Sequence, residues 1–88
     1  MIVREYKIQS EDGLHARPAT TLVRLAKKFT SSLQIKKGDK QIELNSLLNV
    51  LGLTLKYGDL ISLIIEGQDE QEAAAAVDHF FQEQLKSL

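Results

Sequence analysis

The histidine at position 15 is the residue whose type and setting best suit group-transfer chemistry. It stands in the segment 13–19, Gly-Leu-His-Ala-Arg-Pro-Ala, where turn residues give way to apolar residues at helical spacing. The first turn of a helix carries unpaired backbone N–H groups and the positive end of the helix dipole. The amides of Ala16 and Arg17 can therefore receive the oxygens of a phosphate group held next to His15.

Arg17 and Pro18 fit the same chemistry. The Arg17 guanidinium is a permanent cation with several donors, and it can balance the negative charge that a phosphoryl group brings. Pro18 lacks an N–H and occupies the first helical turn without removing a donor. A carrier needs no general base of its own, because a partner enzyme can share the positioning and charge stabilisation. From spacing alone, His15 could also be a surface residue beside a helix cap, with Arg17 as a solvated charge.

The segment is embedded in a chain that alternates between strand and helix patterns. Alternating apolar and charged residues predict a half-buried strand over 2–8. Turn residues follow, and a helix is predicted to begin near Ala16, because apolar residues then recur at intervals of three and four. The residues of this helical stripe are Ala19, Leu22, Val23, Ala26 and Phe29.

A hairpin and a short helix are predicted in the middle of the chain. Two alternating runs, 32–37 and 40–44, flank the turn residues 38–39 and predict two paired strands. Ser46 precedes the apolar residues 47–51 and is typical of an N-cap. A helix of roughly two turns is predicted there.

The last part of the chain predicts a buried strand and a long helix. The β-branched apolar run 60–65 is typical of a central strand buried on both faces or nearly so. Asp69 followed by Glu72 resembles a capping box and predicts a helix that continues to the C-terminus. The predicted buried face of this helix is Ala73, Ala74, Val77, Phe80, Phe81 and Leu85.

The order of these elements, βαββαβα, predicts the fold class. Amphipathic helices must bury their apolar stripes, and one face of a sheet can cover all three. We therefore expect an α+β open-faced sandwich, with a four-stranded antiparallel sheet and three helices on one face. The length of 88 residues is typical of one domain, so we expect a single domain over 1–88.

Composition and charge exclude several classes of function. The 11 basic and 12 acidic residues give a net charge of -1, so no overall field attracts nucleic acid or an anionic membrane. The absence of cysteine excludes disulfides and thiolate zinc sites, and we expect neither a metal nor a cofactor. Residues 1–7 mix apolar and charged side chains, unlike a signal peptide, so we expect a cytoplasmic protein without membrane insertion.

The segment 13–19 resembles the active-site signature of HPr, the histidine-containing phosphocarrier family of the bacterial phosphoenolpyruvate:sugar phosphotransferase system. The resemblance covers nearly the whole chain, because the element order, the length and the serine before the second helix also match. It implies that His15 accepts a phosphoryl group on Nδ1 from enzyme I and passes it to sugar-specific IIA proteins. It also implies that Arg17 stabilises the phosphate, and that the chain is a phosphoryl carrier and not an enzyme.

Ser46 carries a second implication of the resemblance. In HPr proteins of Gram-positive type, the serine at this place is phosphorylated by an ATP-dependent enzyme, the HPr kinase/phosphorylase. The modification weakens sugar-transport phosphotransfer and creates a corepressor for a catabolite-control repressor. The chain departs from the usual Lys-Ser-Ile-Met-Gly pattern, with Asn-Ser-Leu-Leu-Asn over 45–49. It also has Gly52 and Thr54 where the family usually has serine and glycine.

Six residues of the first and second helices are predicted to bind partner proteins. Arg24 and Lys27 lie off the apolar stripe, where they form either a solvated face or a basic rim that steers acidic partner surfaces. The leucines of the second helix either pack into the core or form an apolar docking patch, because two turns cannot bury every side. The predicted set is Thr20, Arg24, Lys27, Leu47, Leu48 and Leu51. We expect the protein to be a monomer.

Three other functions are compatible with parts of the sequence. A regulatory HPr-like protein would act mainly through Ser46 in carbon-catabolite control, but relatives of that kind lack the histidine found here at position 15. A carrier of the nitrogen-related phosphotransferase branch would use the same His15 chemistry with different partners. An RNA-binding α/β sandwich would need a basic surface and exposed aromatic residues, and only Tyr6 and Tyr57 are candidates.

Overall fold

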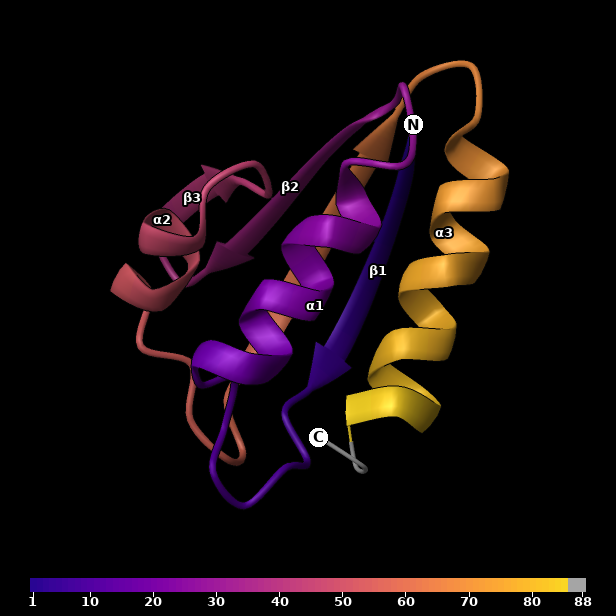
Figure 1. The fold of residues 1–88 in the computed structure, drawn as a ribbon. Helices are drawn as coiled ribbons and strands as arrows, with labels where there is room; N and C mark the ends of the chain where they lie inside the picture. Colours follow the sequence, from indigo (N-terminus) through magenta and orange to yellow (C-terminus); the bar gives the residue numbers. More distant parts are fainter. Residues whose placement is uncertain (86–88) are drawn as a thin grey trace.

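Four strands and three helices form the fold in the predicted order βαββαβα, and the structure, a computed structural model, describes residues 1–85 (Figure 1). The elements are β1 (Ile2–Lys7), α1 (Ala16–Ala26), β2 (Ser32–Lys37), β3 (Lys40–Glu43), α2 (Leu47–Gly52), β4 (Leu60–Glu66) and α3 (Glu70–His79). A π-helical turn, η1 (Phe80–Gln84), continues α3. The last three residues of the predicted helix and domain, 86–88, lie outside the described residues.

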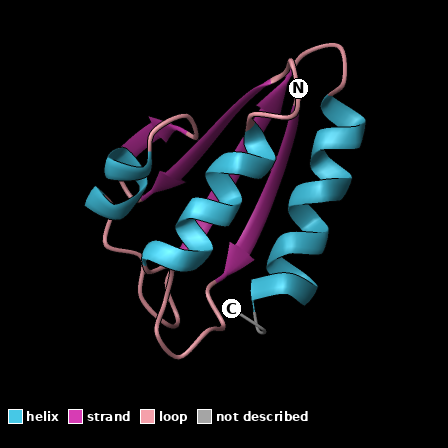
Figure 2. Cartoon of the chain, viewed as in Figure 1, coloured by secondary structure: helices cyan, strands magenta, loops and turns pink. Residues whose placement is uncertain are grey.

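The sheet is antiparallel throughout, in the order β1-β4-β2-β3. The three helices lie on one face of the sheet, and the opposite face is uncovered (Figure 2). The predicted hairpin is confirmed, because β2 and β3 pair directly, with Lys37 opposite Lys40 across the turn. The predicted α+β open-faced sandwich is likewise confirmed.

Strand β4 lies inside the sheet, hydrogen-bonded to β1 on one side and to β2 on the other. The prediction that both of its faces are buried, or nearly so, is wrong. Ile61, Leu63 and Ile65 are buried beneath the helices, whereas Leu60 is 72% exposed and Ile64 is half-buried. An apolar run does not reveal how many faces are covered, and here the helices cover only one.

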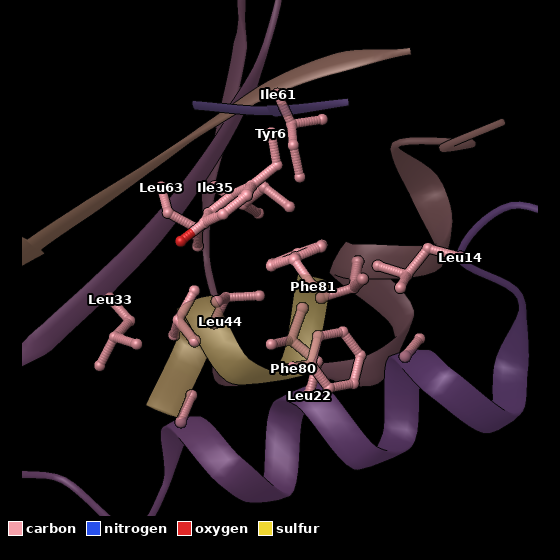
Figure 3. Packing of buried hydrophobic residues seen from close by; sticks show 14 of the residues in the cluster. Tyr6, Leu14, Leu22, Leu33, Ile35, Leu44, Ile61, Leu63, Phe80 and Phe81 are labelled. Carbon is pink, nitrogen blue, oxygen red and sulfur yellow. The ribbon is translucent and has the colours of Figure 1, made fainter. Parts of the chain in front are cut away.

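Helix α1 and the end of α3 meet the sheet in one hydrophobic core (Figure 3). The predicted stripe of α1 is buried over 19–26, while Phe29 lies beyond the helix end and is half-buried. All six residues predicted for the buried face of the last helix are buried. The rings of Phe80 and Phe81 meet edge to face, with centroids 5.0 Å apart, and Phe81 also stacks on Tyr6 of β1 at 4.7 Å.

Two properties of the described residues concern membranes and metals. None of the helices within residues 1–85 has the length and hydrophobicity of a membrane-spanning segment. The same residues contain no group of three or more histidine, aspartate or glutamate side chains placed to hold a metal ion.

Asp69 is the N-cap residue of α3, but the predicted capping box with Glu72 is wrong. The Asp69 carboxylate instead reaches the connection between α1 and β2. There it accepts hydrogen bonds from the amides of Thr30 and Ser31, each at 2.9 Å, and from the Ser31 hydroxyl. These bonds, led by that of the Ser31 side chain, lower the pKa of Asp69 to about 2. The Asp69 carboxylate therefore binds donors in the connection between α1 and β2 and not the amides of α3.

We expect Asp69→Asn to reduce the acid sensitivity of the fold. The folded pKa of about 2 lies below the value of an aspartate in an unfolded chain, about 3.9. The charged carboxylate therefore stabilises the fold fully above roughly pH 4, and this contribution is lost as the pH falls towards 2. Urea unfolding should show that the variant has a lower free energy of unfolding than the wild type at pH 7. This difference should become smaller as the pH falls from 7 to 2.

Asp39 in the hairpin turn provides the matched control for this prediction. It is exposed, so Asp39→Asn removes the same charge from the surface and reports the effect of net charge alone. If the two variants showed the same dependence of stability on pH, the special role of Asp69 would be contradicted.

Candidate functional site

His15 is the N-cap residue of α1, directly before the first helical turn. Its backbone is extended, with φ −79° and ψ −171°, and its carbonyl accepts a helical hydrogen bond from the Ala19 amide at 2.9 Å. His15 is half-buried, whereas Ala16 and Arg17 are exposed. Within residues 1–85, the His15 side chain forms no capping bond at this helix end. The start of α1 thus reaches the surface beside the histidine, which is the arrangement that phosphate binding needs.

The two residues before His15 anchor it to the rest of the fold. Leu14 is buried in the core, as Figure 3 shows, and its amide donates to the Leu55 carbonyl at 3.0 Å. Gly13 has φ +67°, a conformation that favours glycine, and its amide donates to the Ser10 carbonyl at 2.9 Å. A Cβ atom at Gly13 would overlap the Leu55 carbonyl oxygen. The loop before His15 is therefore packed against residues 54–59, which we call the supporting segment.

Thr54 has an unusual backbone conformation at the start of the supporting segment. Its φ of +53° lies in the left-handed region, where a β-branched side chain is strained. The HPr-type pattern usually has glycine here, and the positive φ gives a physical reason for that preference. Gly52, at the end of α2, has no positive φ, so its glycine does not relieve the strain.

We expect Thr54→Gly to stabilise the protein. Relief of the left-handed conformation gains about 1–2 kcal/mol, and the greater freedom of glycine in the unfolded chain offsets roughly 0.5–1 kcal/mol of that gain. Urea unfolding should therefore show a free energy of unfolding about 0.5–1 kcal/mol higher. Thr54→Ala keeps a Cβ atom and should recover only a small part of the gain. An equal gain for alanine would argue against backbone strain at Thr54.

Ser46 caps α2, as predicted. Its hydroxyl accepts a hydrogen bond from the Asn49 amide at 3.4 Å, and its carbonyl accepts one from the Val50 amide at 3.1 Å. The residue is half-buried. Helix α2 packs against α1, so Ser46 begins the helix next to the one that His15 begins (Figure 2).

The three leucines of α2 lie in different environments. Leu48 is 81% exposed, whereas Leu47 and Leu51 are half-buried against the core. Val50 takes the fully buried position of this short helix. The fold therefore leaves Leu48 as the most accessible member of the predicted docking patch.

The polar residues predicted for partner binding follow one side of α1. They are Thr20, Arg24 and the C-cap residue Lys27, and they follow Arg17, which is predicted to stabilise phosphate, at spacings of three and four. Arg24 and Lys27 are exposed, and neither forms an ion pair within the part of the chain that the structure describes. Thr20 is half-buried, and its hydroxyl donates to the Ala16 carbonyl at 2.7 Å. The exposed side chains of this face are therefore mainly cationic.

The residues that support the His15 loop were not predicted. Leu55, whose carbonyl receives the Leu14 amide, is far along the chain and has no local signal for this contact. Gly13 gave part of this information, because a glycine before a helix start allows another backbone segment to approach closely. The sequence did not identify which backbone that is.

Comparisons with known proteins agree with this fold and show the family of the chain. The family model described as the phosphotransferase-system HPr component phosphorylation site matches residues 2–83. The HPr-like protein Crh of Halalkalibacterium halodurans is 36% identical over 84 residues, which cover 96% of this chain and 100% of that protein. The phosphocarrier protein HPr of Lysinibacillus sphaericus is 38% identical over 77 residues, which cover 88% of each chain.

Solved structures of similar proteins have the same fold. The histidine-containing phosphocarrier protein of Mycoplasma matches with a TM-score of 0.91 and 32% identity, over 96% of each chain. A crystal structure of Crh from Bacillus subtilis, described as an intertwined dimer, matches with a TM-score of 0.74 and 32% identity. This second match covers 96% of the present chain and 97% of that one.

Proposed function

Because this chain belongs to the HPr family of phosphotransferase-system phosphocarriers, we propose that it accepts a phosphoryl group on His15 and passes it to other proteins. The observation that carries the proposal is the position of His15 as N-cap of α1, half-buried at the surface and two residues before the exposed Arg17. A helix N-terminus offers amides and a positive dipole end to an anion. A histidine at that point can hold a phosphoryl group that its surroundings stabilise without enclosing it.

The proposed transfer has two steps. An imidazole nitrogen of His15, Nδ1 by family resemblance, forms a bond to phosphorus while the bond between phosphorus and its donor on enzyme I breaks. The phosphoryl group carries two negative charges, which the amides of Ala16 and Arg17 and the Arg17 guanidinium stabilise. In the second step the bond to His15 breaks, as an acceptor group on a sugar-specific IIA protein takes the phosphoryl group. The chain is a carrier and needs no cofactor.

A regulatory role through Ser46 is the second candidate. One relative from Bacillus subtilis is described as a catabolite repression protein, and Ser46 stands at the start of α2. Phosphorylation of Ser46 by an HPr kinase/phosphorylase would place phosphate at this helix end and could create a form that binds a catabolite-control repressor. The complete segment around His15 favours the carrier function as the principal one.

Two incubations test the two roles separately. The purified chain is mixed with phosphoenolpyruvate and enzyme I, and in a second tube with ATP and HPr kinase/phosphorylase. We expect an acid-labile phosphate in the first tube, as phosphohistidine is acid-labile, and an acid-stable one in the second if Ser46 is used. An absence of label with enzyme I from both the sugar and the nitrogen branch would refute the carrier proposal.

The partner surface proposed here consists of Thr20, Arg24, Lys27, Leu47, Leu48 and Leu51. We expect Arg24→Glu combined with Lys27→Glu to lower kcat/KM for transfer from enzyme I about tenfold at low salt, because opposite charges speed the encounter. The loss should shrink as salt screens the charges. Lys40→Glu at the exposed hairpin is the control and should change little. Unchanged rates for the double variant at low salt would exclude a basic docking face.

The proposal includes a single-domain monomer that works in the cytoplasm, where it can move between enzyme I and IIA proteins. One relative forms an intertwined dimer, so the oligomeric state needs its own measurement. Light scattering of the purified chain over a range of concentrations would provide it.

A further inference from the structure

We propose that Lys37 and Asp59 are positioning residues for the phosphoryl site, because they hold the supporting segment in the shape that fixes the loop before His15. The inference rests on the proposed function and adds two residues remote from the helix start. Neither residue belongs to α1, which His15 caps, or to α2, and the proposed partner surface lies on these two helices and the C-cap of α1.

Lys37 connects the two ends of the supporting segment. It is the last residue of β2, and its Nζ donates to the Thr54 carbonyl at 3.0 Å. The same ammonium lies 2.9 Å from Oδ2 of Asp59. The two side chains are 32% and 27% exposed, so solvent screens the pair only in part. One cation thus holds the first and last residues of the segment together.

Asp59 fixes the interior of the same segment. Its Oδ2 accepts a hydrogen bond from the Lys56 amide at 2.8 Å, and its own amide donates to the Lys56 carbonyl at 3.0 Å. The hydrogen bonds from Lys37 and then from Lys56 lower the pKa of Asp59, so the carboxylate is charged at neutral pH. The carboxylate therefore closes the turn over 56–59 and binds Lys37 through one oxygen.

The backbone of the supporting segment holds the loop before His15 at both of its ends. At the beginning of the loop, the Ile8 amide donates to the Asp59 carbonyl at 2.8 Å, and the Gly58 amide donates to the Ile8 carbonyl at 2.7 Å. At its end, the Leu14 amide donates to the Leu55 carbonyl at 3.0 Å. A change in the path of residues 54–59 therefore moves the residue directly before His15.

The strained residue Thr54 explains why the segment needs a holding contact. Its φ of +53° is unfavourable for a β-branched residue, and its carbonyl is the one that Lys37 binds. Without Lys37, the peptide after Thr54 can relax and carry the Leu55 carbonyl with it. A displacement of about 1 Å at a phosphoryl-transfer site is sufficient to slow the reaction strongly.

The test compares Lys37→Met with Lys36→Met, its neighbour on the exposed face of β2. For Lys37→Met we expect kcat for transfer from enzyme I to fall about tenfold with KM nearly unchanged, because the docking residues stay in place. The exchange of the Leu14 amide with solvent deuterium should become about tenfold faster. Lys37→Arg should restore both values, and Lys36→Met should change neither.

Asp59→Asn is a second variant, and it preserves an acceptor for the Lys56 amide while removing the charge that binds Lys37. We expect faster Leu14 exchange in this variant too. The inference would be overturned if the Leu14 amide exchanged with solvent as slowly in Lys37→Met as in Lys36→Met, or if kcat were unchanged in Lys37→Met. If the wild type accepts no phosphate from enzyme I, the proposed function fails, and the exchange rate alone decides whether Lys37 positions the loop.

Discussion

The His15→Ala variant should accept no phosphate from enzyme I and phosphoenolpyruvate, while its stability stays close to that of the wild type. In the proposed transfer the imidazole supplies the nitrogen that bonds to phosphorus, and alanine offers no nucleophile in its place. His15 is half-buried and lies outside the hydrophobic core, so alanine leaves no large cavity. Transfer is measured as acid-labile label per molecule, and stability by urea unfolding. We expect a complete loss of label.

The second histidine gives the control for this experiment. His79 is exposed at the end of α3, and His79→Ala should be phosphorylated at the wild-type rate. Arg17→Gln should still be labelled, but about 100-fold more slowly, because it loses a charged donor and keeps the nucleophile. Acid-labile label that persists in His15→Ala would place the acceptor elsewhere in the chain.

The second large effect is expected for Gly13→Ala. The new Cβ would overlap the Leu55 carbonyl oxygen and would lie about 3.0 Å from Cα of Lys56. The residue also has φ +67°, which costs a non-glycine residue roughly 1–2 kcal/mol. Displacement of the loop adds the loss of the Leu14 to Leu55 hydrogen bond, worth about 1 kcal/mol or more. We expect the free energy of unfolding to fall by about 2–4 kcal/mol in total.

Gly13→Ala should also slow phosphotransfer in the molecules that remain folded, because His15 lies only two residues after Gly13 and directly follows the displaced loop. Gly38→Ala is the matched control. Gly38 has a similar φ of +58°, but a Cβ there would meet no atom within 4 Å. Gly38→Ala should therefore lower the free energy of unfolding only by the cost of the left-handed backbone conformation, about 1–2 kcal/mol, and leave phosphotransfer unchanged. Equal losses for the two variants would show that the contact with Leu55 is unimportant.

The parts of the fold that depend on near neighbours could be predicted from the sequence. The start of α1 at Ala16, the hairpin around 38–39 and the cap at Ser46 each follow from patterns within a few residues. The resemblance of segment 13–19 to the HPr signature is confirmed at the level of the family. The roles of His15, Arg17 and Ser46 are still predictions for the experiments above.

The parts that depend on distant residues could not be predicted. Asp69 has the local setting of a capping box, yet the donors that it uses belong to the connection before β2. Lys37 is the last residue of β2, whereas Asp59 directly precedes β4, and no periodic pattern joins the two residues. The number of covered faces of β4 depends on where the helices pack, and this is a property of the assembled fold.

The uncovered face of the sheet also offers a practical attachment point. Glu5 is exposed on β1 and alternates with the buried Tyr6, so it lies on the face away from the helices. Because the sequence contains no cysteine, Glu5→Cys would create a unique thiol. A dye or sensor surface coupled there would leave the starts of α1 and α2 free, so that encounters with other proteins could be followed one molecule at a time.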